Sequence, residues 1–303
     1  MPFGLLTGLG AALSWGTMDI ATALSSRLIG SLRVTAGVQL VCAVFLVLAG
    51  IVAGTTIPSD PSTLVMATVL GLIGAGAYFA YFTGLRIGPI SVVSGMVAAY
   101  GGLTVVLSVV LRGESLTPLQ ALGATVATVG VILTGVAFGG GLRATRFAGP
   151  GVIFAVVALV LFALMAITMD VALDSAEWIQ VLLVSRLVIA LVSIIAIVAL
   201  AIAGRRTATS AAAPASPGLV TRALPRRRIA VMLVVAGALD ATGLISFAIG
   251  LSSAPTWLVG LASSFGPAVT ILFAVAFLGE RLKPIQWLGL FGVALGMIAI
   301  GLP

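Results

Sequence analysis

Four ionisable side chains lie inside long apolar stretches, and these are the residues whose types could do chemistry. They are Asp19, Asp170, Arg186 and Asp240. A charged side chain in the core of a bilayer costs several kcal/mol unless it faces protein or water, so such residues are functional candidates by default. The chemistry that they indicate is binding of a substrate or of a proton.

The three carboxylates differ in depth. Asp240 lies near the middle of its stretch among small residues, which favours substrate or proton binding over a structural hydrogen bond to a neighbouring helix. Asp19, Trp15 and Thr22 share one helical face, which indicates a cavity wall, with packing of Trp15 and an interfacial Asp19 as the alternative. Asp170 is nearer the end of its stretch, so an interfacial position is expected.

Arg186 keeps its proton under physiological conditions, so it must snorkel to the interface or contact an anion. Asp240 or Asp170 could supply that anion in a structural ion pair. The alternative is that Arg186 binds a carboxylate of the substrate. Gln39 occupies a similar depth in another stretch, where we expect it to form a hydrogen bond between packed helices.

The composition requires a membrane around these residues. Of 303 residues, 61% are hydrophobic and only 8% are charged, against roughly 25% charged in soluble domains. Apolar stretches long enough to cross a bilayer predict an all-α integral membrane protein with ten transmembrane helices. The expected ranges are 4–25, 33–53, 63–85, 89–111, 118–138, 150–173, 179–203, 229–252, 255–278 and 284–302.

An internal repeat divides these helices into two sets of five. Eleven positions of the first half recur in the second at one fixed offset, and a shorter match links 17–19 with 168–170. Five is an odd number, so homologous halves must enter the membrane from opposite sides, as inverted repeats do. We expect halves at 1–140 and 141–303, with a flexible Arg-rich loop at 204–228. The recurring positions are Gly84-Leu85, Pro89, Gly113-Glu114, Leu116, Pro118, Gln120, Gly123, Gly130 and Gly135, matched by Gly250-Leu251, Pro255, Gly279-Glu280, Leu282, Pro284, Gln286, Gly289, Gly296 and Gly301.

Helix breakers stand at matching places in the two halves. Gly101 and Gly102 interrupt one stretch, and Gly266 and Pro267 interrupt its counterpart. Matched interruptions indicate hinges beside a binding site in repeat proteins, and a simple packing kink is the alternative. Polar and aromatic residues nearby complete the candidate substrate-binding set, with Tyr81 and Phe82 as further aromatic walls. These members are Tyr78, Tyr100, Ser263 and Ser264.

Several function classes are excluded. The formal charge of +7 comes from Arg residues in short loops without interleaved aromatic residues, so we expect no nucleic acid partner. The chain has one cysteine, Cys42, and no histidine, so we expect no metal, no cofactor and no enzyme activity. A channel fits five plus five inverted helices poorly, since no ring of repeated charges is present. The sequence gives no indication of oligomeric state.

The distribution of Lys and Arg predicts the orientation. With the N-terminus outside, cytoplasmic loops hold thirteen of the fifteen basic residues, while Arg112 falls outside and Arg186 within a helix. Because cytoplasmic loops carry the excess of basic residues, we expect a multi-pass protein of the plasma (inner) membrane with both termini outside.

The segment Gly-Glu-x-Leu-x-Pro-x-Gln-x-x-Gly, which begins at Gly113 and at Gly279, resembles the EamA-type branch of the drug/metabolite transporter superfamily. That resemblance implies export of a small metabolite, such as an amino acid, through a cavity between the halves. We therefore expect a secondary transporter that works by alternating access, with protons as a possible coupling ion. Glu114 and Glu280 are expected to shape a turn and help start the next helix. The alternative is a membrane sensor or interaction protein whose Arg-rich loop docks a partner.

Overall fold

Helices account for nearly all of the described chain. The computed structural model describes residues 2–55, 58, 60–88, 90–136, 150–202, 225–266, 268–269 and 284–301. Their helices are α1 (Pro2–Ile29), α2 (Ser31–Ala53), α3 (Pro61–Ile87), α4 (Ile90–Val97), α5 (Tyr100–Arg112), α6 (Pro118–Val136), α7 (Pro150–Leu173), α8 (Trp178–Ile202), α9 (Arg226–Leu251), α10 (Thr256–Ser263) and α12 (Pro284–Gly301).

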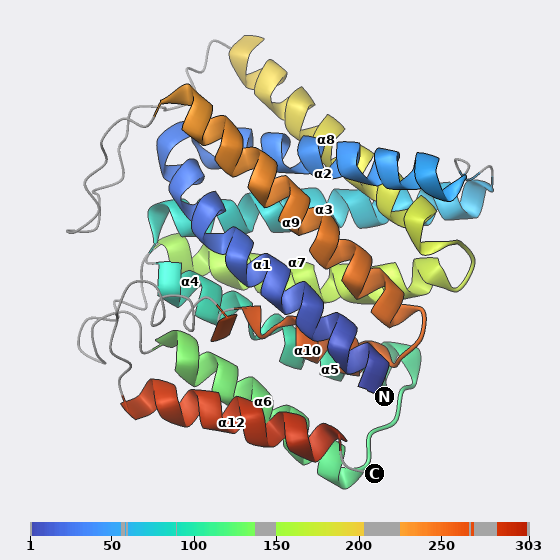
Figure 1. Cartoon of the computed structure of the whole chain (residues 1–303), viewed down its shortest axis with the longest axis vertical. Coiled ribbons are helices and arrows are strands. Elements are labelled where there is room, and N and C mark those ends of the chain that lie inside the picture. Colours follow the sequence, from blue (N-terminus) through green and yellow to red (C-terminus); the bar gives the residue numbers. More distant parts are fainter. Residues whose placement is uncertain are drawn as a thin grey trace.

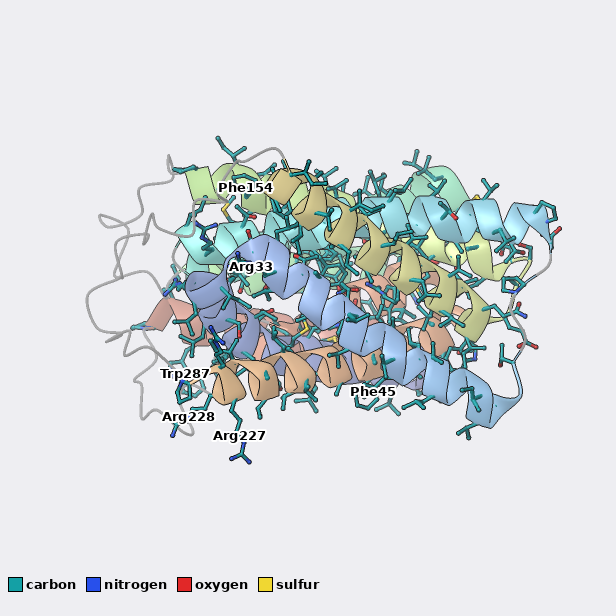
Figure 2. The ribbon with its side chains drawn as sticks, turned by 90° about the horizontal axis from the view of Figure 1, so that it is seen from above. Arg33, Phe45, Phe154, Arg227, Arg228 and Trp287 are labelled. Atoms are coloured by element: carbon teal, nitrogen blue, oxygen red, sulfur yellow. The ribbon has the colours of Figure 1, made fainter. Side chains whose placement is uncertain are left out.

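Six of the described stretches are long and apolar enough to cross a membrane. Large apolar side chains cover the outer surface, as at Phe45 on α2, which points away from the bundle in Figure 2. The long helices therefore present lipid-compatible surfaces outward. These six stretches are Ser31–Ala53, Pro61–Ile87, Val93–Arg112, Pro150–Leu173, Trp178–Ile202 and Arg226–Leu251.

Three expected elements need correction. The stretch 255–278 is not one helix, because a turn at Ser264 and Phe265 follows the end of α10. The stretch 89–111 is not one helix, because a turn at Ala98 and Ala99 separates α4 from α5. The last residues of the expected loop 204–228 belong to α9, which begins at Arg226 directly after Pro225. Proline has a fixed φ that suits a helix start, and arginine favours helix, which explains the earlier beginning. Residues 204–224 of that loop lie outside the described residues.

The halves interlock through equivalent pairs of helices. In Figure 1, α1 lies along α9 and α3 along α7, so the first helix of each half packs on the third helix of the other. The last helices of the halves, α6 and α12, also pack together, through glycines of the repeat. A Cβ atom on Gly130 would lie 2.6 Å from the backbone nitrogen of Val293, and one on Gly123 would lie 2.8 Å from the carbonyl oxygen of Gly296. Small residues thus allow the two backbones to touch.

The two ends of the bundle differ in charge. Arg33, Arg227 and Arg228 lie at one end in Figure 2. In Figure 1, α1 begins and α12 ends at the opposite end of the bundle. We call these the basic end and the terminal end.

Candidate functional site

A cavity of about 80 Å³ lies between the two halves. Its walls come from α1, α3, α4, α7 and α9 and from the residues around the two helix breaks. Six aromatic side chains dominate the lining, and Phe162 packs edge-on against Tyr78 and Tyr81, with ring centroids 5.4 and 5.8 Å apart. The aromatic members of the lining are Trp15, Tyr78, Tyr81, Tyr100, Phe162 and Phe247, and the polar members are Asp19, Ser94, Ser263 and Ser264.

Both breaks border the cavity, and they are equivalent under the repeat. The turn at Ala98 and Ala99 has its counterpart at Ser264 and Phe265, at the same offset that relates the two halves elsewhere. Across the breaks, the Tyr100 hydroxyl and Ser263 Oγ are hydrogen-bonded at 2.7 Å, so the halves meet here.

The glycines that were expected to interrupt the stretch 89–111 do not lie in the break itself. Gly101 and Gly102 lie inside the first turn of α5, just after the break. A Cβ atom on Gly101 would collide with the Ser264 side chain, and one on Gly102 would lie 2.5 Å from Thr128 Cγ2. Gly266 approaches the backbone of Gly16 on α1, while Pro267 lies outside the described residues. These glycines permit close packing around the breaks, and their role as hinges stays a prediction.

Asp240 on α9 is fully buried and accepts three hydrogen bonds. Its Oδ1 accepts from the Tyr78 hydroxyl at 2.8 Å and from Trp15 Nε1 at 3.2 Å, and its Oδ2 accepts from Gln39 Nε2 at 2.9 Å. Gln39 Oε1 in turn accepts from Arg186 at 2.8 Å. We call these five residues the Asp240 network. It joins α1, α2, α3, α8 and α9, and it satisfies a carboxylate that no water reaches.

Arg186 has a different partner from the one expected. Among the described residues, the ion pairs all belong to Arg112, so neither Asp240 nor Asp170 pairs directly with Arg186. Instead Gln39 stands between Arg186 and Asp240, and the guanidinium lies 5.1 Å from the centre of the Tyr78 ring. Arg186 Nε is buried without a hydrogen-bond partner. Arg186 does not line the cavity, and neither does Asp240.

Asp19 on α1 does line the cavity. Its side chain is 5% exposed, and Oδ2 accepts a hydrogen bond from Ser94 Oγ at 3.3 Å. The Ser94 hydroxyl also lies 3.1 Å from the hydroxyl of Tyr81. Asp19 is thus the one charged side chain in the described lining, held at one side of an aromatic chamber.

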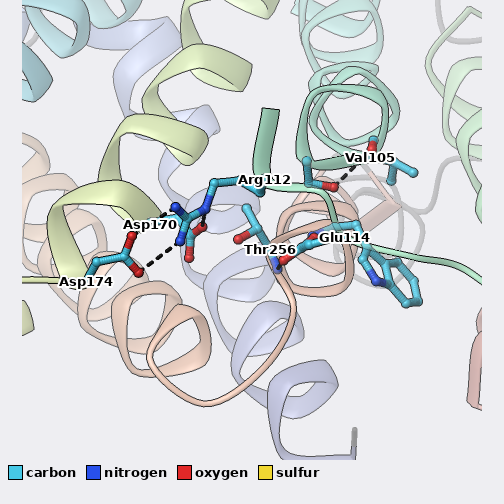
Figure 3. A network of polar contacts seen from close by, with 8 residues as sticks. Val105, Arg112, Glu114, Asp170, Asp174 and Thr256 are labelled. Atoms are coloured by element: carbon cyan, nitrogen blue, oxygen red, sulfur yellow. Dashed lines mark hydrogen bonds and ion pairs between the residues drawn. The ribbon is translucent and has the colours of Figure 1, made fainter. Parts of the chain in front are cut away.

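Polar contacts join the halves between the cavity and the terminal end. Arg112, at the end of α5, contacts Asp170 at 2.6 Å and Asp174 at 2.9 Å, both near the end of α7 (Figure 3). We call these three residues the Arg112 latch. Asp170 is therefore near its helix end as expected, although its partner was not foreseen.

Glu114 adds a second contact at this end. Instead of helping to start α6, its carboxylate accepts hydrogen bonds from the backbone nitrogens of Thr256 at 2.7 Å and Trp257 at 3.1 Å (Figure 3). These are the first residues of α10, where free N–H groups and the helix dipole favour an anion. The described structure does not include Glu280, its counterpart.

Sequence reasoning missed Ser94, Phe162 and Phe247 in the lining and Arg112 and Asp174 in the latch. The signal for Arg112 was present, because it is the one basic residue that the charge count places outside. The lining residues carry no comparable signal, since serine and phenylalanine are ordinary in membrane helices.

Comparisons with known proteins agree on the fold. The sequence model of the EamA-like transporter family matches residues 2–136 and 149–302. No curated protein matches. A solved structure described only as the crystal structure of a protein superposes with a TM-score of 0.75 over 98% of this chain and 96% of that chain, at 20% identity. This likeness shows the fold alone.

The Asp240 network predicts a large effect of removing its central amide. In Gln39→Leu, Asp240 loses a donor and the buried Arg186 loses its acceptor, so we expect unfolding free energy to fall by about 2–4 kcal/mol. Thr35→Val is the control, because Thr35 lies one turn earlier on α2 and its hydroxyl bonds only to Ser31 O in its own helix. Thermal unfolding of the purified proteins measures the difference, and equal midpoints for Gln39→Leu and the parent would contradict the role of the amide.

Proposed function

Because the chain belongs to the EamA-like transporter family, we propose that it is a secondary transporter that exports a small metabolite, an amino acid or a molecule of similar size. The family is one of transporters and not of enzymes, so a membrane enzyme is set aside. The chain is a multi-pass membrane protein, and its partners are the lipid bilayer and a small-molecule substrate.

One observation carries the proposal of alternating access: the cavity lies between the halves and is bordered by both helix breaks. Residues 1–140 and 141–303 would rock about the cavity and expose it to each side of the membrane in turn. The breaks at 98–99 and 264–265, with Gly101, Gly102 and Gly266 packed beside them, are where the helices can bend. The Tyr100–Ser263 hydrogen bond would change as they do.

Asp240 lies outside the cavity lining but is hydrogen-bonded to residues that form the lining. Asp240 holds Trp15 and Tyr78, both of which line the cavity, by their polar hydrogens. Protonation of Asp240 would weaken these hydrogen bonds, which is a route for coupling protons to the shape of the cavity. Arg186 balances the negative charge through Gln39.

The Arg112 latch and Glu114 hold the two halves together at the terminal end. Each joins the first half to the second, so opening this end requires both contacts to break. Charge-assisted hydrogen bonds of this kind are strong enough to favour one state and weak enough to reopen.

The charge of the basic end supports a cytoplasmic position for it, with both termini outside the plasma (inner) membrane. A fluorescent protein that matures only in the cytoplasm, fused to the C-terminus, should therefore stay dark, whereas an alkaline phosphatase fused there should be active. The reverse pattern would invert the orientation.

Uptake by proteoliposomes tests the function. We expect saturable uptake of at least one member of a panel of radiolabelled amino acids, amines and sugars, measured with and without a pH gradient. Asp240→Asn should lower the rate and, if protons are coupled here, remove the response to the gradient. If a folded parent protein moves no member of the panel, the result counts against transport and favours a membrane sensor or interaction protein.

The latch predicts an order among substitutions at the terminal end. The Asp170 side chain is 11% exposed and that of Asp174 is 57% exposed. Asp170→Asn should therefore slow transport by about tenfold or more, because it leaves Arg112 without its more buried partner. Asp174→Asn should slow transport by less than about threefold.

Arg227→Gln is the control for the latch, because it removes an exposed charge from the basic end. Initial rates of uptake in proteoliposomes, at matched protein content, provide the measurement. A larger effect of Asp174→Asn than of Asp170→Asn would contradict the assignment of the latch.

A further inference from the structure

The cavity has one charge in its described lining, and that charge is negative. Asp19 is the carboxylate, and the remaining polar side chains of the described lining are neutral hydroxyls and the indole of Trp15. The two other charges at this depth are occupied elsewhere, since Asp240 accepts three hydrogen bonds and Arg186 donates to Gln39 outside the lining. A ligand that contacts the described lining therefore meets a carboxylate and no guanidinium.

The repeat shows that Asp19 lacks a partner that its counterpart has. Asp19 and Asp170 occupy the same place in the repeated Thr-Met-Asp sequence. Asp170 is paired with Arg112, but the residue that corresponds to Arg112 in the second half is Leu278. Among the residues whose placement is described, no ion pair reaches Asp19. The second half therefore has no arginine at the position that pairs with the aspartate of the repeat in the first half.

The surroundings of Asp19 suit a cation with an apolar body. Six aromatic side chains line the chamber, and a cation is attracted to the face of an aromatic ring when water is excluded. Ser94 holds the carboxylate in place by its hydroxyl. In the described lining, a substrate carboxylate would find only neutral donors, which compensate its desolvation less well than a guanidinium does.

We propose that the cavity recognises a small organic monocation, with the ammonium group against Asp19 and the apolar body among the aromatic rings. This inference rests on the proposed function, because it names the substrate class of the same cavity. A free amine is preferred to the corresponding amino acid, and an amino acid to the corresponding acid. The ammonium group that amino acids share with amines is the recognised part.

Three probes with one aliphatic body test this order. Isoamylamine, leucine and 4-methylpentanoate carry a positive charge, both charges and a negative charge, respectively. We expect calorimetric titration of the purified full chain in a non-ionic detergent to show isoamylamine binding at least about tenfold more tightly than leucine, with 4-methylpentanoate weakest. Equal or reversed affinities would overturn the proposal, as would the absence of amine binding to folded protein.

Substitutions at Asp19 locate the binding group. Asp19→Asn should weaken isoamylamine binding by about tenfold or more, because the charge is lost while the shape is kept. Asp19→Glu keeps the charge and should retain measurable binding, which guards against a variant that fails only because it does not fold. Asp60→Asn is the control, since this exposed carboxylate caps the start of α3 and asparagine caps equally well. Undiminished amine binding by folded Asp19→Asn would overturn the role of Asp19.

Measurements of amine binding and of uptake test the cation site and the transport function separately. Amine binding that depends on Asp19, without uptake by proteoliposomes, would support the site and contradict transport. Saturable uptake of another solute, without amine binding, would support transport and overturn the site.

Discussion

A carboxylate in the middle of a bilayer needs hydrogen-bond donors from the protein, because hydrocarbon offers none. Asp240 meets this requirement with an indole, a phenol and an amide from three other helices. These hydrogen bonds fix the positions of Trp15, Tyr78 and Gln39 relative to Asp240. They thereby join α1, α2 and α3 of the first half to α9 of the second. Arg186 is also buried and also needs a partner from the protein, and the side-chain oxygen of Gln39 accepts its hydrogen bond. The wall of the cavity depends on these bonds, since Trp15 and Tyr78 form part of it.

The two halves share a fold but divide the charges unequally. Glycines at equivalent positions let α6 and α12 touch, and equivalent turns break the helices beside the cavity. The charged residues do not follow this symmetry, since the position that corresponds to Asp240 is Gly74 and the position that corresponds to Arg112 is Leu278. The symmetric features support two exchangeable states, and the asymmetric charges make the two ends and the binding site different.

The architecture was predictable from the sequence because each of its causes is local. Long apolar stretches indicate helices, and a repeat with an odd number of helices indicates inverted halves. The break at Ala98 and Ala99 was expected three residues later, at Gly101 and Gly102, since alanine gives no breaking signal and glycine does. The partners of Asp240, Arg186 and Glu114 depend on distances between helices far apart in the sequence. Depth within a helix identifies a candidate residue, but it does not say whether the side chain faces the cavity, as Asp19 does, or lies behind the wall, as Asp240 does.

Alternating access is tested most directly by following both ends of the molecule at once. One pair of spin labels would replace the exposed Ser115 and Ser175 near the latch, and a second pair would replace Arg33 and Arg227 at the basic end, in a chain with Cys42→Ala. Distances are then measured by double electron–electron resonance in liposomes, with and without a transported solute. Alternating access predicts a second population in which the distance at the terminal end is longer and the distance at the basic end is shorter. A single, unchanged distance at both ends, in protein that still transports, would contradict it.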